Sequence, residues 1–292
     1  MASMRDIKRR IKSVSSTQQI TKAMNLVASS KLTKAKNRFS ESKPYSEAIK
    51  GVVAEIVAGS SDVKSEFLQP REVKKTLVLV LAGDRGLCGG YNTNVCKAAY
   101  KVIQEKDNES CVITIGSKAK DYFKHKRTEI EDEVRGISEN PVYGDAFAIG
   151  AKVIRMYAEK EVDEVYIAYT EFISTISSEP KVMKLLPLDP NDFKATENKS
   201  DDTTNDLTLT IYEPSEEEVL DYIVPKYVNT VVYSALVESA VCELGARMTA
   251  MDSATENASE MIDTLNLKYN RVRQGAITQE LTEIVSGSNA LE

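Results

Sequence analysis

The segment from residue 244 to residue 276 limits the possible fold most, because its apolar and small residues alternate at spacings of four and three over more than four heptads. This pattern keeps one seam along a helix and is typical of a coiled coil. Small residues in the seam let a partner helix approach closely, but they weaken the hydrophobic contribution. The seam positions are Leu244, Met248, Met251, Thr255, Ala258, Ile262, Leu265, Tyr269, Val272 and Ala276.

Residues 4–58 predict a second long helix, since they hold no Gly before Gly51 and no Pro except Pro44. A helix of this length would extend roughly 80 Å at about 1.5 Å per residue. Its apolar stripe slips between blocks, which indicates an interrupted seam. The blocks are Met4, Ile7, Ile11 and Val14, then Ile20, Met24 and Val27, then Leu32, Ala35 and Phe39. We expect the two terminal helices to wrap each other antiparallel.

The C-terminal helix is expected to run from about Lys226 to about Val285, with Gly287 ending it. A short lead-in helix should follow Pro214, because acidic residues fill its first turn. Pro225 should then interrupt or kink the chain between the two helices.

Between the terminal helices, strands alternate with helices, which predicts a mostly parallel open sheet. The expected strands are 75–82, 111–116, 164–170, 181–188 and 207–213, and the expected helices are 92–106, 117–126 and 143–160. The polar stretch 189–206 should be a mobile surface loop. We therefore predict an α/β fold, with a long antiparallel coiled coil of N- and C-terminal helices and a central Rossmann-like α/β domain. The expected domains are residues 1–60, 72–213 and 214–292.

Positive charge is concentrated near the N-terminus. Residues 1–50 carry twelve Lys and Arg against three acidic residues, so their net charge is +9, although the whole chain carries −6. The other 242 residues therefore carry −15. Such an arm suggests nucleic acid, anionic lipid or an acidic protein as partner, and a solvated basic face is the simpler alternative. With Phe39 and Tyr45 as its aromatic residues, the arm is poorly suited to stacking on single-stranded bases.

The cysteines and the hydropathy pattern bear on the compartment. Cys88, Cys96, Cys111 and Cys242 form no C-x-x-C pair and lie in apolar segments, which favours buried, reduced thiols. No stretch approaches the roughly 20 apolar residues of a membrane span, and the N-terminus lacks the apolar region of a signal peptide. We expect a chain that is neither exported nor membrane-spanning.

A glycine-rich loop, GDRGLCGG at 83–90, follows the first expected strand. Its spacing G-x-x-G-x-x-G-G matches neither the dinucleotide fingerprint G-x-G-x-x-G nor the phosphate loop G-x-x-x-x-G-K-[ST]. No acidic residue ends the next strand to hold a ribose. We interpret the loop as a glycine turn, with a phosphate on the backbone N–H groups near Asn92 as the alternative.

No catalytic or metal-binding constellation stands out in the sequence. His125 is the chain's one histidine, lies in a charged segment and has no His or Cys at metal-ligand spacing. Any catalytic arrangement that uses a histidine would have to use this one. We expect His125 on the surface, and we expect neither a cofactor nor a metal.

Four segments together resemble the gamma subunit of bacterial F-type ATP synthases over essentially the whole chain. They are MASMRDIKRRIKSVSSTQQITKAMNLVASSKL, AGDRGLCGGYN, ARMTAMDSATENASEMIDTL and YNRVRQGAITQELTEIVSG. The resemblance implies a non-catalytic rotor shaft whose coiled coil stands inside a ring of alternating alpha and beta subunits. It also implies a foot that sits on the membrane c-ring with the epsilon subunit, at the cytoplasmic face of the bacterial cell membrane.

The resemblance implies partner contacts for six residues. Arg273 and Gln274 would meet a catch loop of beta, and Thr278, Glu280 and Glu283 would lie nearby on the same tip. Met24 and the basic helix around it would face an acidic lever of beta.

The resemblance bears on three other places in the chain. Residues 212–214 would lie near the foot. The family commonly has other residues where this chain has Asn25, Ser29 and Thr33. The chain has no cysteine-bearing insert of the chloroplast kind, so the resemblance implies no thiol switch.

Two other interpretations follow from the residues alone: a Rossmann-type enzyme with helical oligomerisation arms, and a basic coiled-coil protein that binds nucleic acid. Co-purification separates the three, since the first predicts alpha, beta and epsilon subunits, the second a dinucleotide and the third a polyanion.

We predict that the isolated chain binds neither ATP nor NAD at residues 83–90, because the loop lacks the spacing that cradles a phosphate. Isothermal titration calorimetry with each nucleotide should therefore give no saturable heat. A stoichiometric complex that is abolished by Gly86→Val would contradict the prediction.

Overall fold

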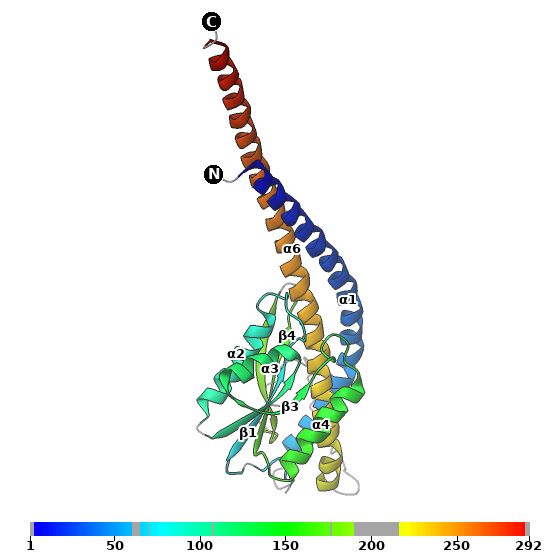
Figure 1. Ribbon diagram of the computed structural model, residues 1–292. Helices are drawn as coiled ribbons and strands as arrows, with labels where there is room; N and C mark the ends of the chain where they lie inside the picture. The colour runs from blue at the N-terminus through cyan, green and yellow to red at the C-terminus, as the bar shows by residue number, and fades with distance from the viewer. Residues whose placement is uncertain are drawn as a thin grey trace. The chain divides into compact units, whose positions relative to one another are not determined.

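A computed structural model describes residues 3–59, 65–69, 71–106, 108–175, 177–189 and 216–289 (Figure 1). The chain divides into two compact units. The coil unit combines Met1–Ser29 with Arg247–Glu292, and the body is Ser30–Ala246. The expected strand at 207–213 and nearly all of the expected loop at 189–206 lie outside the described residues.

The body is built on a five-stranded sheet with the strand order β3-β2-β1-β4-β5. Strands β1 to β4 are parallel, and β5 runs antiparallel to β4. The strands are β1 (Lys75–Leu81), β2 (Glu109–Ile115), β3 (Glu129–Val134), β4 (Glu164–Phe172) and β5 (Ser178–Leu186). The mostly parallel sheet is confirmed, as are the four expected strands that fall within the described residues.

Strand β3 is absent from the expected strands because its sequence, EIEDEV, is acidic and lacks an apolar run. Its charges are paired with cations from neighbouring elements. Lys75 Nζ lies 3.2 Å from Glu129 Oε1, and Lys152 Nζ lies 2.7 Å from Asp132 Oδ2. An edge strand with charged side chains resists pairing with another chain, so the acidic sequence suits the position of β3 at the sheet edge.

Helices cover both faces of this sheet. On one face, Val78 and Val80 of β1 share a core with Val95 and Phe123 of two helices. On the other face, Leu79 shares a larger core with α4 and with parts of the two terminal helices. Both faces of β1 are buried because successive side chains of a strand point to opposite sides. The three shorter helices lie where the sequence predicts them and are α2 (Tyr91–Glu105), α3 (Ser117–Lys126) and α4 (Tyr143–Ala158).

The two long helices are α1 (Met4–Gly59) and α6 (Glu216–Asn289). The expected bounds of α1 are confirmed, but those of α6 are wrong: it is one helix that passes through Pro225 and Gly287. A proline weakens a helix locally, but the residues on both sides of it are fixed in the core. These residues are Leu220, Val224, Tyr227 and Val228. No helix among the described residues is long and apolar enough to cross a membrane.

In the coil unit, α1 and α6 form an antiparallel coiled coil, as expected. The hydroxyl oxygens of Thr21 and Thr255 lie 2.7 Å apart, and Asn25 Nδ2 donates a hydrogen bond of 3.0 Å to the Met248 carbonyl. Residue numbers thus rise along α1 as they fall along α6. On α6 the predicted seam residues are buried or half-buried in this unit, whereas those that follow the seam are exposed.

The expected interruption in the seam of α1 is wrong. Within the coil unit, buried and half-buried residues of α1 form an unbroken four-three series, which is Ile7, Ile11, Val14, Gln18, Thr21, Asn25 and Ala28. The other half-buried residues lie directly beside this series, and they are Asp6, Ser15, Met24 and Ser29. Ile20 and Val27, which belong to the expected stripe, are each 57% exposed. Polar residues can fill the seam because their side chains find hydrogen-bond partners there, as Thr21 and Asn25 do.

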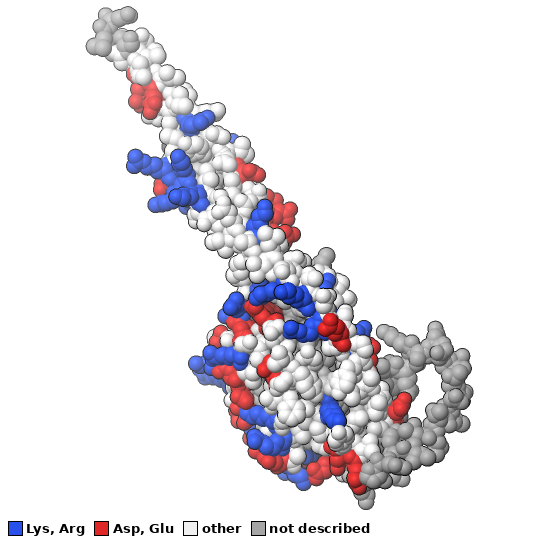
Figure 2. All heavy atoms as spheres, turned by 90° about the vertical axis from the view of Figure 1, so that its right-hand side faces the viewer, with Lys and Arg blue, Asp and Glu red and all other residues white. Residues whose placement is uncertain are grey.

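Basic side chains gather on the surface of the coil unit (Figure 2). Arg9, Arg10 and Lys268 line a hollow there, together with Asp6, Ile7 and Leu265. Asp6 pairs with Arg9 at 3.1 Å, so the hollow keeps a net positive charge. The hollow therefore favours an anionic group over a cation.

All four cysteines are buried and none is in a disulfide, which confirms the expectation of buried, reduced thiols. Burial raises the pKa of Cys96 to about 12 and that of Cys111 to about 11. Both thiols are therefore protonated near neutral pH, and protonated thiols are poor nucleophiles.

Arg71 and Asp163 fasten the start of β1 to the end of α4. Asp163 Oδ1 lies 2.9 Å from Arg71 Nε, and its Oδ2 accepts the backbone N–H groups of Lys74 and Lys75 at 2.8 and 3.1 Å. The guanidinium also stacks on the ring of Tyr157, 4.2 Å from its centroid. Burial by itself would raise the pKa of Asp163, but the two N–H groups and Arg71 outweigh it and lower the pKa.

Asp163→Asn should lower the free energy of unfolding near neutral pH by about 1.5–3 kcal/mol, the contribution of hydrogen bonds to a charged group. Since the pKa of folded Asp163 lies below its ordinary value of 3.8, this contribution is present above that value and is lost as the pH falls through the lower, folded pKa. Urea unfolding at a series of pH values should show a difference in the free energy of unfolding between wild type and variant, and this difference should become smaller in acid.

The control for this measurement is Asp252→Asn, which changes an exposed aspartate of α6. It should leave the free energy of unfolding nearly unchanged at every pH. A difference for Asp163→Asn that is no larger than the control's, or that does not become smaller in acid, would contradict the assignment.

Candidate functional site

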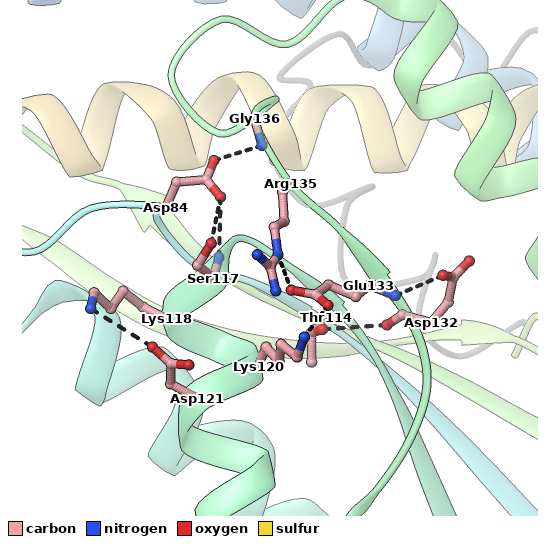
Figure 3. Close-up of polar contacts among 10 residues, drawn as sticks. All are labelled: Asp84, Thr114, Ser117, Lys118, Lys120, Asp121, Asp132, Glu133, Arg135 and Gly136. Atoms are coloured by element: carbon pink, nitrogen blue, oxygen red, sulfur yellow. Dashed lines mark hydrogen bonds and ion pairs between the residues drawn. The ribbon is translucent and has the colours of Figure 1, made fainter.

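Asp84 lies in the loop that leads from β1 to α2, and its carboxylate joins three loops at the carboxyl edge of the sheet (Figure 3). Oδ1 accepts hydrogen bonds from the backbone N–H of Ser117 at 3.1 Å and from its hydroxyl at 3.3 Å. Oδ2 accepts hydrogen bonds of 2.9 Å from the Gly136 N–H and from the Ser138 hydroxyl. One side chain therefore ties the loop after β1 to the loops after β2 and β3.

The Ser117 N–H belongs to the first turn of α3, and the N–H groups at a helix start favour an anionic group. In this chain the Asp84 carboxylate lies at that position. Gly116, the residue before α3, has a φ of +90°, and a Cβ there would lie 2.2 Å from the Ala82 carbonyl oxygen. The glycine thus serves the close packing of two loops.

The glycine-rich loop is also closed on itself by Asn92. Its Oδ1 accepts the N–H of Gly83 at 2.7 Å, and its Nδ2 donates to the Arg85 carbonyl at 3.1 Å. The interpretation of this loop as a glycine turn at the end of a strand is confirmed.

The same loop packs against α6 inside the body. Cys88 and Tyr91 share a small core with Cys242, and the Tyr91 hydroxyl donates a hydrogen bond of 3.1 Å to the Ser239 carbonyl. Burial raises the pKa of Tyr91 well above its ordinary value, so this hydroxyl stays protonated and keeps its hydrogen bond. The loop therefore holds the edge of the sheet against a terminal helix.

His125 lies exposed on α3, which confirms its expected surface position. Among the described residues, no group of three or more His, Cys, Asp or Glu side chains could hold a metal ion. The charged groups near the sheet edge pair with one another, as Figure 3 shows for Glu133 with Lys120 and Arg135. Arg135 first, and then Lys120, lower the pKa of Glu133.

The second candidate site lies on α6 between Arg273 and Val285, where every residue except Ala276 is exposed. We call it the terminal face. It consists of two neighbouring rows at four-three-four spacing, which lie side by side on a helix. The rows are Arg273, Ile277, Glu280 and Ile284, and Gln274, Thr278, Leu281 and Val285.

Apolar side chains occupy half of the terminal face. Ile277, Leu281, Ile284 and Val285 are between 49% and 68% exposed. Figure 2 shows few charged side chains along this end of the helix. A contiguous exposed apolar surface of this kind is typical of a region that contacts another protein.

The structure brings four of the six predicted partner-binding residues together on the terminal face: Arg273, Gln274, Thr278 and Glu280. Glu283 lies on the adjacent side of the helix, where its Oε1 accepts a hydrogen bond of 3.0 Å from Gln279 Nε2. Met24 is half-buried on α1, next to the seam residue Asn25.

The apolar half of the terminal face is missing from the sequence-based site. The sequence does contain a signal for these apolar residues: the apolar positions of the helix shift by one residue, from the seam that ends at Ala276 to a new row that begins at Ile277. The predicted seam ends at Ala276, so the four apolar residues beyond it carry no role in that pattern.

Part of the basic N-terminal arm is used within the chain. Lys31, Lys36 and Arg38 bind groups in the loops of the body at 2.6 to 2.7 Å. The charge that remains for a partner is therefore smaller than the +9 of residues 1–50.

Comparison with known sequences gives matches along the full chain. A family model described as ATP synthase matches residues 3–291. The ATP synthase gamma chain of Alkaliphilus metalliredigens is 48% identical over 289 residues, which cover 99% of each chain. The ATP synthase gamma chain, sodium ion specific, of Acetobacterium woodii is 47% identical over 298 residues, or 99% of this chain and 98% of that one.

Solved structures show the same fold. A chain of the Euglena gracilis mitochondrial ATP synthase, in its OSCP/F1/c-ring structure, has a TM-score of 0.69 at 20% identity and covers 99% of this chain and 94% of its own. A chain of the Tetrahymena thermophila mitochondrial ATP synthase central stalk and c-ring has a TM-score of 0.62 at 24% identity, and covers 80% of this chain and 99% of its own. The sequence relatives and the shared fold agree: the chain belongs to the ATP synthase gamma chain family.

Proposed function

We propose that this chain is the central-stalk rotor subunit of an F-type ATP synthase. It couples ion-driven rotation of the c-ring to the conformational cycle of the catalytic beta subunits, in ATP synthesis and in hydrolysis. The observation that carries the proposal is the 48% identity to a gamma chain over 99% of both chains. In this role the chain is non-catalytic, and the nucleotide chemistry takes place on beta.

The antiparallel coil supports a mechanical role. A shaft whose surface differs from side to side contacts each beta subunit differently, so its orientation acts as a ligand that biases each subunit toward an open or a closed state. The coil unit offers such asymmetry, because Ile20 and Val27 are exposed on α1 while basic residues line the hollow at Arg9, Arg10 and Lys268.

The terminal face is the proposed contact with beta. Arg273 and Gln274 would hydrogen-bond a catch loop, with Thr278 and Glu280 beside them and Glu283 at the edge. A guanidinium bonded to a carboxylate contributes about 1.5–3 kcal/mol. The exposed apolar residues between these polar groups support the proposal, since a surrounding protein would remove them from water.

Met24 and the cations of α1 in the coil unit are the proposed contact with an acidic lever of beta. Opposite charges on the two surfaces would steer the shaft and would set its register within the ring.

The central segment is the proposed foot. Residues 72–213 would sit on the c-ring and bind epsilon, while residues 1–60 and 214–292 supply the shaft. This arrangement would hold the chain at the cytoplasmic face of the bacterial cell membrane as a peripheral subunit.

The double change Arg273→Ala with Gln274→Ala should assemble normally but lower ATP hydrolysis several-fold. Rotation should persist, because torque is spread over many contacts and no pair worth about 1.5–3 kcal/mol carries a whole step. The measurement is ATP hydrolysis and ion pumping by the reconstituted complex.

The matched control is Glu256→Ala with Asn257→Ala, which removes two adjacent exposed polar side chains from the same helix. It should retain more activity than the variant of the terminal face. Wild-type rates of hydrolysis and pumping in the Arg273 and Gln274 variant would show that this end of α6 is a passive bearing.

A further inference from the structure

Residues 31–39 of α1 lie within the body and are held on one side by the connection from β3 to α4. Lys31 Nζ lies 2.6 Å from Glu139 Oε2. Seven residues later, or about two helical turns, Arg38 Nη1 donates a hydrogen bond of 2.7 Å to Asn140 Oδ1. Two successive loop residues thus bind two cations of the same helix.

A second loop, which connects β4 to β5, holds the same stretch of α1. Lys36 Nζ donates a hydrogen bond of 2.6 Å to Thr175 Oγ1 and lies 5.6 Å from the ring centroid of Phe172. Phe39 packs edge-on against Phe172, with the two ring centroids 5.8 Å apart. The N–H of Phe172, the last residue of β4, donates a hydrogen bond of 2.8 Å to Glu238 Oε1. The start of this loop is therefore tied to α6 as well.

The two loops hold different faces of α1. Lys31 and Arg38 are seven residues apart, which places them on one face of a helix, whereas Lys36 is five residues from Lys31 and lies roughly 140° around the axis. Contacts on two such faces resist rotation of a helix about its own axis. Contacts on one face alone would resist that rotation less.

Glu139 is itself anchored to other parts of the body. Its Oε1 also lies 3.8 Å from Arg85 Nη1 in the glycine-rich loop. The residues before it, Gly136 and Ser138, bind the carboxylate of Asp84. A force on Lys31 therefore passes through Glu139 to the sheet edge and not to a free loop.

These contacts contribute little to the stability of the body. Partly exposed ion pairs are weak, and the side chains of Lys31 and Glu139 are 48% and 24% exposed. The stability resides in the apolar core, to which α1 contributes Val53, Ile56 and Val57 farther along the helix. The contacts at residues 31–38 act instead on the angular setting of α1, to which the buried Leu32 in the same stretch also contributes.

We propose that Glu139 is a torque-bearing residue: by binding Lys31 and Arg85, it fixes the rotational setting of α1 against the sheet of the body. The inference rests on the proposed rotor function, because a rotor must transmit rotation between its foot and its shaft. The role requires neither a nucleotide nor a metal ion at Glu139.

The angular setting can be measured in the isolated full-length chain. Because the four native cysteines are buried, spin labels can be placed at the exposed positions Asn37→Cys on α1 and His125→Cys on α3. Pulsed electron–electron spectroscopy then reports the distribution of distances between α1 and the body. Glu139→Lys should broaden this distribution, and the milder Glu139→Gln should broaden it less.

Two variants separate a specific contact from a general effect of charge. The exchange of Lys31→Glu and Arg85→Glu with Glu139→Lys restores both pairs with their charges reversed, and it should return the distribution to nearly the wild-type width. Glu105→Lys reverses one charge of the exposed pair Lys101–Glu105 on α2 and should leave the width unchanged.

The consequence is measured in the reconstituted complex. Glu139→Lys should assemble and hydrolyse ATP, but it should pump several-fold fewer ions per ATP, and the charge exchange should recover the ratio. The thermal midpoint of the isolated variant should match that of Glu105→Lys.

An unchanged distance distribution in Glu139→Lys overturns the proposal, as does broadening that the charge exchange leaves in place. A normal ratio of ions pumped to ATP hydrolysed in a variant with a broadened distribution overturns the torque-bearing role. Failure of the wild-type chain to assemble with alpha and beta would count against the rotor function, while the distance measurement on the isolated chain would still decide whether Glu139 sets the angle.

Discussion

The four-three seam buries one stripe of α1 and one stripe of α6, and in the coil unit this burial is the main source of stability for both helices. Helices in water depend on packing along a side, because their own hydrogen bonds barely offset the entropy of ordering the chain. The body does not share this dependence, since its helices pack on a sheet with two apolar faces. The two units therefore rest on different amounts of buried apolar surface.

Polar residues in the seam bury less apolar surface than apolar residues would, but they make the pairing of the two helices more specific for one register. The hydroxyl oxygens of Thr21 and Thr255 lie 2.7 Å apart, and each also lies within 3.0 Å of a carbonyl of its own helix. Because a hydroxyl has one hydrogen, one of the two donates across the seam while the other donates to its own helix. Shifting one helix along the other would separate them and leave two polar groups to be satisfied elsewhere. A seam of this kind favours one register, as a single buried polar residue does in other coiled coils.

Much of the fold follows from the sequence, because the β-branched runs and the apolar periodicity are strong local signals. Three features do not. The acidic strand β3 depends on cations that fold back from β1 and α4, and the helix through Pro225 depends on a core formed by distant segments. The role of Asp84 requires three loops to meet at one sheet edge. The polar half of the terminal face was found through family resemblance, whereas its apolar half follows from a one-residue phase shift.

The position of Asp84 has a consequence for how the molecule responds to its surroundings. A phosphate that binds at a helix start comes and goes with its concentration, but a carboxylate that is part of the chain cannot dissociate. The Asp84 carboxylate therefore occupies the start of α3 without any ligand from solution, and it ties together the loops gathered around it. The anion that holds this edge of the sheet together is thus encoded in the sequence, so every copy of the chain carries it.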